Sequence, residues 1–110
     1  MKLANLERIK VFHSTLFAYY LDKLKATPDG EGSLLDHSCL LWGSGMSDSN
    51  AHSPLDVPYL MVGKAAGAFQ ARGHIASAKG TQLADIMLTV AQRYGVETNT
   101  FGVSSKPFAL

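Results

Sequence analysis

The fold is decided by residues 38–62, which read SCLLWGSGMSDSNAHSPLDVPYLMV. Short apolar runs at 38–42 and 57–62 enclose a polar loop that is rich in glycine and serine. Because neither run alternates polar with apolar residues, we expect two strands that are covered on both faces, as in a helix-flanked sheet. Pro58 lacks an amide donor and is expected at the start of its strand. The small residues of the loop let the backbone turn tightly, so any chemistry is expected there.

An amphipathic helix is predicted before this stretch. Apolar residues recur at three- and four-residue steps between positions 6 and 24, which is the spacing of one helix face. This predicted face consists of Leu6, Ile9, His13, Leu16, Phe17, Tyr20 and Leu24. On such a face, His13 is expected to be a hydrogen-bonded core histidine. Pro28 cannot continue a helix and glycines follow it, so the helix should end near Ala26.

A second helix is predicted after the strands. Thr81 is a suitable N-cap, and Gly95 would end the helix at its C-terminal side. Its apolar face would consist of Leu83, Ile86, Met87, Val90, Ala91 and Tyr94. We expect the tail, 96–110, to pack as an extended segment anchored by Phe101 and Phe108. Together these elements predict an α/β fold with a long N-terminal helix, short strands of a helix-flanked sheet and a closing C-terminal helix.

Length and composition predict a single α/β domain, 1–110, or the C-terminal fragment of a larger one. The 110 residues are 46% hydrophobic and 17% charged, which is enough apolar material for a core and unlike a disordered chain. A chain of this size buries only about two thirds of the surface that it exposes when unfolded. Large apolar faces left uncovered would need a partner, so we expect self-association.

Several classes of function are disfavoured. The net charge of +1, without a cluster of either sign, argues against nucleic acid as a partner. The apolar runs are far shorter than the roughly 20 residues that span a bilayer, and residues 1–7 lack the pattern of an export signal. The single Cys39 can form no internal disulfide and is expected to be a buried thiol. The glycines around Ser44 do not form a nucleophile elbow, and those at 63–73 lack the ending of a phosphate-binding loop.

The polar loop offers candidate metal ligands. Asp48 and His52 are four residues apart, so one helical turn would bring them to the same side, able to share a divalent cation such as zinc or calcium. A mononuclear zinc site needs at least three protein ligands, so His37, Asp56 or His74 would have to converge with them. The other candidate binding groups are Ser44, Ser47, Asn50 and His74. The alternative is that the loop's polar side chains, Asp48 among them, cap the turn through hydrogen bonds to the backbone.

The order of these features resembles a known family. Residues 9–102 are similar in order and spacing to the C-terminal part of the secreted bacterial proteins grouped as domain of unknown function 1552. The residues that carry the resemblance are Leu35-Asp36 before the strand, Ser47-Asp48, Asn50 and His52 in the loop, and Gly95-Val96-Glu97-Thr98 after the closing helix.

The resemblance implies a fold and an activity. Members of the family are several times longer and carry an export signal, so this chain would be a fragment of an extracytoplasmic protein. The family is related to the alkaline phosphatase and sulfatase superfamily, whose α/β sandwich holds metal-binding Asp and His on loops after strands. By this resemblance, Asp48 and His52 would hold a cation that polarises a phosphate or sulfate ester. The nucleophile and other ligands lie in the family's N-terminal half, so the fragment alone would be inactive. The competing hypothesis is a non-catalytic structural or protein-interaction module.

Overall fold

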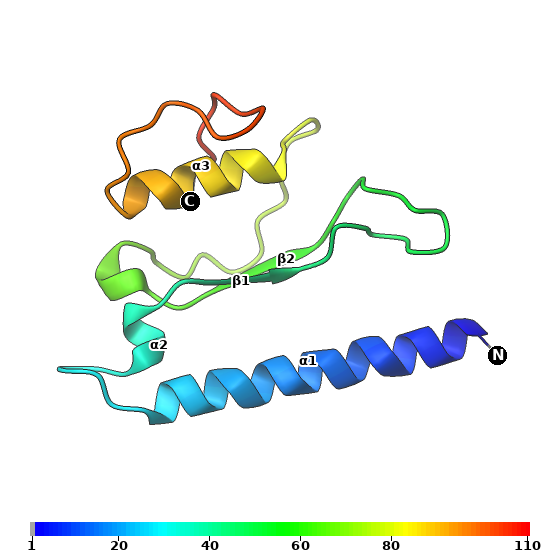
Figure 1. Ribbon diagram of the computed structural model, residues 1–110, viewed down its shortest axis with the longest axis horizontal. Coiled ribbons are helices and arrows are strands. Elements are labelled where there is room, and N and C mark those ends of the chain that lie inside the picture. Colours follow the sequence, from blue (N-terminus) through cyan, green and yellow to red (C-terminus); the bar gives the residue numbers. More distant parts are fainter. Residues whose placement is uncertain (1) are drawn as a thin grey trace. The chain divides into compact units, whose positions relative to one another are not determined.

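The computed structural model describes residues 2–110 (Figure 1). Its elements are α1 (Lys2–Ala26), α2 (Leu34–His37), β1 (Leu40–Gly43), β2 (Tyr59–Val62), the short 3-10 helix η1 (Ala65–Gly67) and α3 (Leu83–Arg93). Contacts within the chain group these elements into two compact units, Met1–Ala66 and Gly67–Leu110. The predicted mixture of helix and strand, with a long N-terminal helix and a closing C-terminal helix, is confirmed.

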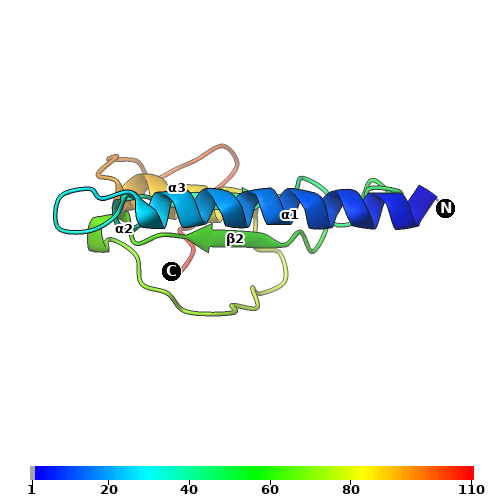
Figure 2. The same cartoon turned by 90° about the horizontal axis from the view of Figure 1, so that it is seen from below.

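The first unit contains α1, which ends at Ala26 as predicted and runs beside the hairpin of β1 and β2 (Figures 1 and 2). The residues of α1 that are half-buried share one narrow face: Phe17, Leu21 and Leu24. The ring of Phe17 stacks on Trp42 of β1, with the ring centroids 5.2 Å apart and the planes inclined by 15°. The other residues at 4–26 are exposed. His13 is among them, so the expectation of a core histidine is wrong.

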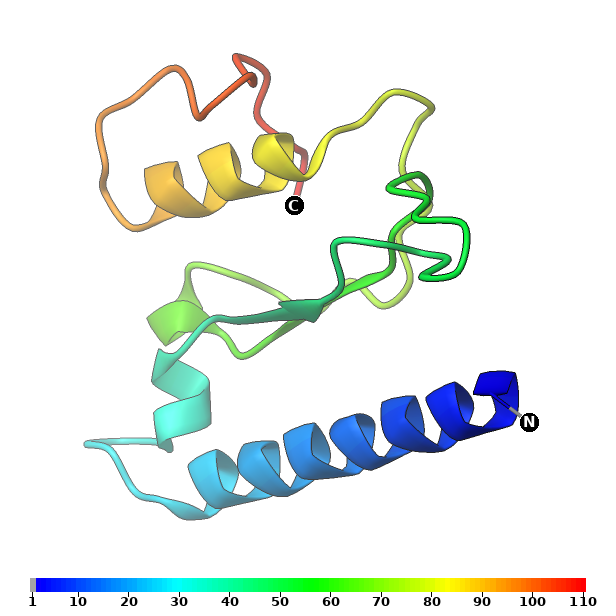
Figure 3. The ribbon, with the colours of Figure 1, turned by 45° about the vertical axis from the view of Figure 1, so that its right-hand side comes forward.

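The strands β1 and β2 form a two-stranded antiparallel sheet (Figure 3). Leu40 lies opposite Val62 and Gly43 opposite Tyr59, so residues 44–58 close a hairpin. Parallel strands need a long crossover that is usually helical, and this loop contains no helix. None of the residues in β1 and β2 is buried, and the expectation of strands covered on both faces is therefore wrong. The residue directly before β2 is Pro58, in agreement with its predicted place at a strand start.

A capping box begins α2, and a close backbone approach joins the two ends of the hairpin that follows it. Ser33 Oγ accepts the amide of Asp36 at 3.3 Å, and Asp36 Oδ2 accepts the amide of Ser33 at 3.0 Å. Directly after β2, Gly63 has φ of +102° and lies against the backbone carbonyl of Ser38. That carbonyl also accepts the amide of Ala65 at 2.9 Å. These contacts fix the two ends of the hairpin to each other.

In the second unit, α3 starts one residue later than predicted. Its N-cap is Gln82, whose amide donates to Oδ2 of Asp85 at 2.9 Å. The predicted cap, Thr81, donates its hydroxyl to the carbonyl of Ala78 at 2.8 Å instead. A side chain that is engaged with the preceding loop cannot cap the helix, which explains the shift. Gly95, with φ of +82°, follows the C-cap and ends the helix as predicted.

The core of the second unit centres on Leu88, which is 0% exposed. The next most buried residues of this unit are Ser104, Thr89 and Phe69, at 4%, 5% and 7% exposure. The predicted apolar face of α3 did not include Leu88, and it did include Tyr94, which is 56% exposed. The buried side of α3 is therefore rotated relative to the predicted one.

Hydrogen bonds hold the C-terminal tail on α3. Ser104 Oγ donates to Asp85 Oδ1 at 2.6 Å, and this bond is the main reason why the pKa of Asp85 is lowered. Thr89 Oγ1 donates to the carbonyl of Phe108 at 2.8 Å. The backbone of Phe108 therefore anchors the tail, and this residue is half-buried. Phe101 is 46% exposed, so its predicted role as an anchor is wrong, and the buried Ser104 takes that place.

Candidate functional site

The loop between β1 and β2 folds around the carboxylate of Asp48. Its Oδ1 accepts the amides of Asn50 at 2.8 Å and of Ala51 at 3.1 Å. The amide of Ser47 donates to the carbonyl of Ser53 at 2.9 Å, and the amide of Ser53 donates to the carbonyl of Asp48 at 3.0 Å. The hydrogen bonds from Ala51 and then Asn50 lower the pKa of the exposed Asp48. This is the arrangement that the turn-capping alternative predicted.

The other candidate groups of the loop also make local contacts. Ser44 Oγ accepts the amide of Met46 at 3.2 Å, and Ser47 Oγ donates to the carbonyl of Ser53 at 3.3 Å. His52 is exposed and has φ of +52°, which is uncommon for a residue other than glycine. The serine hydroxyls are thus engaged in the turn itself.

The described residues provide no third ligand for a metal ion at Asp48 and His52. Among residues 2–110, no three His, Cys, Asp or Glu side chains gather as a metal site would require. Of the further ligands considered, His37 lies with Nδ1 2.8 Å from Oδ2 of Asp29. The other two are exposed: Asp56 and His74. Two ligands do not complete a mononuclear zinc site, so the metal stays a prediction.

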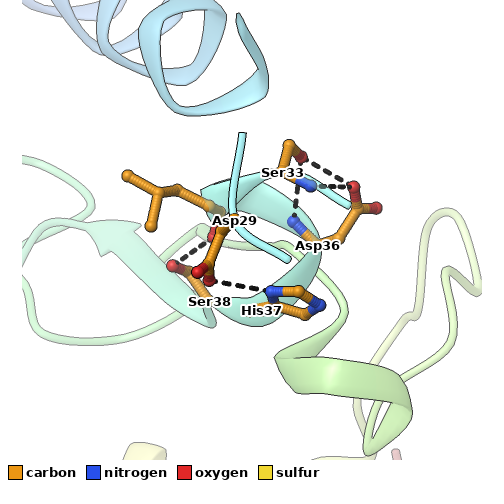
Figure 4. Close-up of polar contacts among 6 residues, drawn as sticks. Asp29, Ser33, Asp36, His37 and Ser38 are labelled. Atoms are coloured by element: carbon orange, nitrogen blue, oxygen red, sulfur yellow. Dashed lines mark hydrogen bonds and ion pairs between the residues drawn. The ribbon is translucent and has the colours of Figure 1, made fainter. Parts of the chain in front are cut away.

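A polar cluster that the sequence reasoning missed lies at α2 (Figure 4). The hydroxyl of Ser33 donates to Asp36 Oδ2 at 2.6 Å, and Lys64 Nζ lies 2.8 Å from Asp36 Oδ1. The hydrogen bond from Lys64, and then those from Ser33, hold the pKa of Asp36 well below its ordinary value. Asp29 and His37 form the second pair of the cluster. The sequence carried a signal for it, because a serine followed three residues later by an aspartate is a capping-box pattern.

Acid is expected to weaken this cluster. Folding lowers the pKa of Asp36, so its contribution to stability is complete above the ordinary carboxyl pKa of about 3.9 and is lost as the pH falls toward the folded value. We expect Asp36→Asn to lower the urea midpoint at neutral pH, measured by the fluorescence of Trp42. The effect should shrink steadily as the pH is lowered from about 4 toward about 2. Glu7→Gln is the control, because Glu7 is exposed and takes part in neither ion pair of the described residues. An effect of Asp36→Asn that is independent of pH would contradict this prediction.

The second candidate site is an apolar side of α1. Four large side chains follow one another at steps of three and four residues and share one side of the helix. This exposed stripe consists of Ile9, Phe12, Leu16 and Tyr19, which are 49%, 60%, 50% and 60% exposed. It lies on a different side of α1 from the half-buried residues Phe17, Leu21 and Leu24. No helix within residues 2–110 has the length and apolar character to cross a membrane. A continuous apolar surface of this kind is typical of a protein-interaction site.

The second unit also has an open pocket of about 370 Å³, whose walls include Phe69, Arg72 and Arg93. Nη1 of Arg72 donates to the carbonyl of Ala109 at 3.4 Å, so the chain's own tail occupies one of its donors. Both arginines are exposed. The pocket therefore lacks the enclosed, mostly apolar walls that are typical of small-molecule sites.

The exposed stripe of α1 is thus the described surface with the clearest chemical character, and the loop at Asp48 is a turn held by its own polar groups.

The sequence matches no protein-family model, and no curated protein or solved structure is significantly similar to it.

Proposed function

We propose that this chain is a non-catalytic protein-interaction module that binds its partner through the exposed stripe of α1. The single observation that carries the proposal is the exposure of four large apolar side chains on one side of that helix. By the resemblance described above, the module would form the C-terminal part of a larger extracytoplasmic bacterial protein.

Covering the stripe is favourable for two reasons. Burying a large apolar side chain contributes about 1.5–3 kcal/mol, so covering the exposed halves of four contributes roughly 3–6 kcal/mol before the entropy of association is subtracted. Residues 4–16 of α1 are also exposed throughout, whereas helices obtain most of their stability from packing. A partner on the stripe would supply the packing that this half of α1 lacks.

A metal-dependent hydrolase with an alkaline-phosphatase-like sandwich remains a separate proposal for the larger protein. In this chain, Asp48 and His52 would contribute two ligands, and the remaining ligands and the nucleophile would come from elsewhere. The carboxylate of Asp48 already accepts two backbone amides, which favours the interaction module as the role of the chain itself.

Because uncovered apolar faces are expected to drive self-association, the proposal includes association of the chain with itself, and it predicts that a charge placed on the stripe abolishes this association. Leu16→Glu is compared with Val11→Glu, since both residues are exposed, at 50% and 61%, but Val11 lies on the polar side of α1. In sedimentation velocity, we expect the wild type and Val11→Glu to associate with increasing concentration and Leu16→Glu to remain monomeric. Hydrogen exchange at 4–16 should slow with association only in the first two.

The emission of Trp42 shows whether each variant keeps the fold of the first unit, because that side chain stacks on α1. A wild-type chain that stays monomeric, with fast exchange at 4–16 at its highest soluble concentration, would overturn the proposal. Equal loss of association in both glutamate variants would overturn it as well.

A further inference from the structure

We infer that the partner of the exposed stripe is a second copy of this chain, and that the two α1 helices pair antiparallel with Arg8 of each copy facing Asp22 of the other. This inference rests on the proposed function and names its partner. It is carried by the spacing and the charges of the side chains around the stripe.

The exposed stripe has the spacing of a coiled-coil seam. Ile9 and Leu16 fall at a positions of two heptads, and Phe12 and Tyr19 fall at d positions. The flanking positions differ in character between the two sides of the seam. One flank consists of Leu6, His13 and Tyr20, and the other of Arg8, Thr15 and Asp22. In coiled coils, charges on such flanks select the partner and its orientation.

An antiparallel pair uses these positions symmetrically. With the two-fold axis level with Ser14, Ile9 lies against Tyr19 of the second copy, and Phe12 lies against Leu16. The same axis sets Arg8 opposite Asp22 on the charged flank. Because the operation is two-fold, each of these contacts occurs twice in the dimer.

The charges also disfavour the parallel arrangement. In a parallel pair, the a position after the stripe would bring the two Lys23 ammonium groups together in the seam, where like charges repel. In the antiparallel pair, Lys23 lies opposite Asn5 of the second copy, so no like charges meet. Nζ of Lys23 lies 5.1 Å from the centre of the Tyr19 ring of its own helix and can keep this cation–π contact in the dimer. A parallel pair would also leave Arg8 without a carboxylate across the seam.

Arg8 and Asp22 are available for such pairing. Both side chains are exposed, and the ion pairs of the described residues are formed by others, His37 with Asp29 and Lys64 with Asp36. The positive and negative ends of the charged flank are therefore free to complement a copy that runs in the opposite direction.

The apolar area is sufficient for a dimer. Besides the stripe, two apolar residues lie on the flank opposite the charged one: Leu6 and Tyr20, which are 39% and 50% exposed. At about 100 Å² for the exposed part of each large side chain, six of them bury roughly 600 Å² per copy and 1,200 Å² in total. Specific interfaces need about 1,000 Å² in total, so the pair reaches the range of a weak but specific dimer.

A charge swap tests the pairing in the full chain. We expect Asp22→Arg to weaken dimerisation about tenfold in sedimentation equilibrium, because it converts two attractive contacts into two repulsive ones. Arg8→Asp should have a similar effect, and the double variant Arg8→Asp with Asp22→Arg should restore the dimer to within about threefold of the wild type. Glu7→Arg is the matched control, since it makes the same change of charge on the other side of α1 and should leave dimerisation unchanged.

Cross-linking tests the orientation independently in a Cys39→Ser background. Leu6→Cys mixed with Tyr20→Cys should be joined by a short bis-maleimide, whereas Leu6→Cys alone should not, because its two copies would lie about 24 Å apart along the helix axis. Cross-linking of Leu6→Cys to itself, or no rescue by the charge swap, would overturn the antiparallel pair. If Leu16→Glu still abolishes association in that case, the interaction module stands and only this inference fails.

Discussion

Gly63→Ala is expected to destabilise the first unit by about 3–5 kcal/mol, through an unfavourable backbone conformation together with steric overlap. The φ of +102° is one that residues with a side chain rarely adopt. A Cβ would overlap the carbonyl oxygen of Ser38 and lie 3.0 Å from that of Leu35. The Ser38 carbonyl cannot withdraw freely, since it accepts the amide of Ala65 at 2.9 Å. Urea unfolding followed by the fluorescence of Trp42, the single tryptophan, measures the loss.

Two other glycines of the first unit separate the causes. Gly45 has no positive φ and no heavy atom within 4 Å of an added Cβ, so Gly45→Ala should change stability by less than about 0.5 kcal/mol. Gly30 has φ of +57° but equally open surroundings, so Gly30→Ala should cost about 1–2 kcal/mol from the conformation alone. If Gly63→Ala lowered the free energy of unfolding no more than Gly30→Ala does, steric overlap with the Ser38 carbonyl would contribute nothing to the loss.

The parts of the fold that were predicted correctly depend on neighbouring residues. The helix α1 ends at Ala26, two residues before Pro28, and α3 ends directly before Tyr94 and Gly95. Proline and glycine act on the backbone of their immediate neighbours, so these ends could be predicted. Pro58 marks the start of β2 for the same reason. The N-cap of α3 was misplaced by one residue, because Thr81 and Gln82 can both precede a helix and only the contact of Thr81 with Ala78 decides between them.

The errors concern which surfaces are covered. Periodicity shows that Ile9 and Leu16 share a side of α1, but it cannot show that only the side of Phe17 is packed. The apolar runs predict strands that are covered on both faces. The sheet has only two strands, and none of their residues is buried. Burial depends on contacts between distant segments, and a single sequence does not specify them.

The same division holds for the candidate site. The turn-capping role of Asp48 follows from hydrogen bonds within three residues, so the sequence could propose it. Convergence of a third metal ligand would require distant residues to meet, which no local pattern encodes. The pairing of Asp36 with Lys64 is also distant in sequence, although the capping box of Asp36 with Ser33 could have been recognised.

Leu88→Ala is expected to unfold the second unit. Leu88 is fully buried, and removing a leucine side chain from a core costs about 2–5 kcal/mol. Single cores in chains this small rarely supply more than about 3–5 kcal/mol, so little stability would remain. Hydrogen exchange of the α3 amides, measured by NMR, should change from protected to fast. Val103→Ala, at a position that is 83% exposed in the same unit, should leave the protection unchanged. Protection of α3 in Leu88→Ala equal to that in Val103→Ala would mean that the second unit does not depend on this side chain, and that its stability comes from the hydrogen bonds between α3 and the tail.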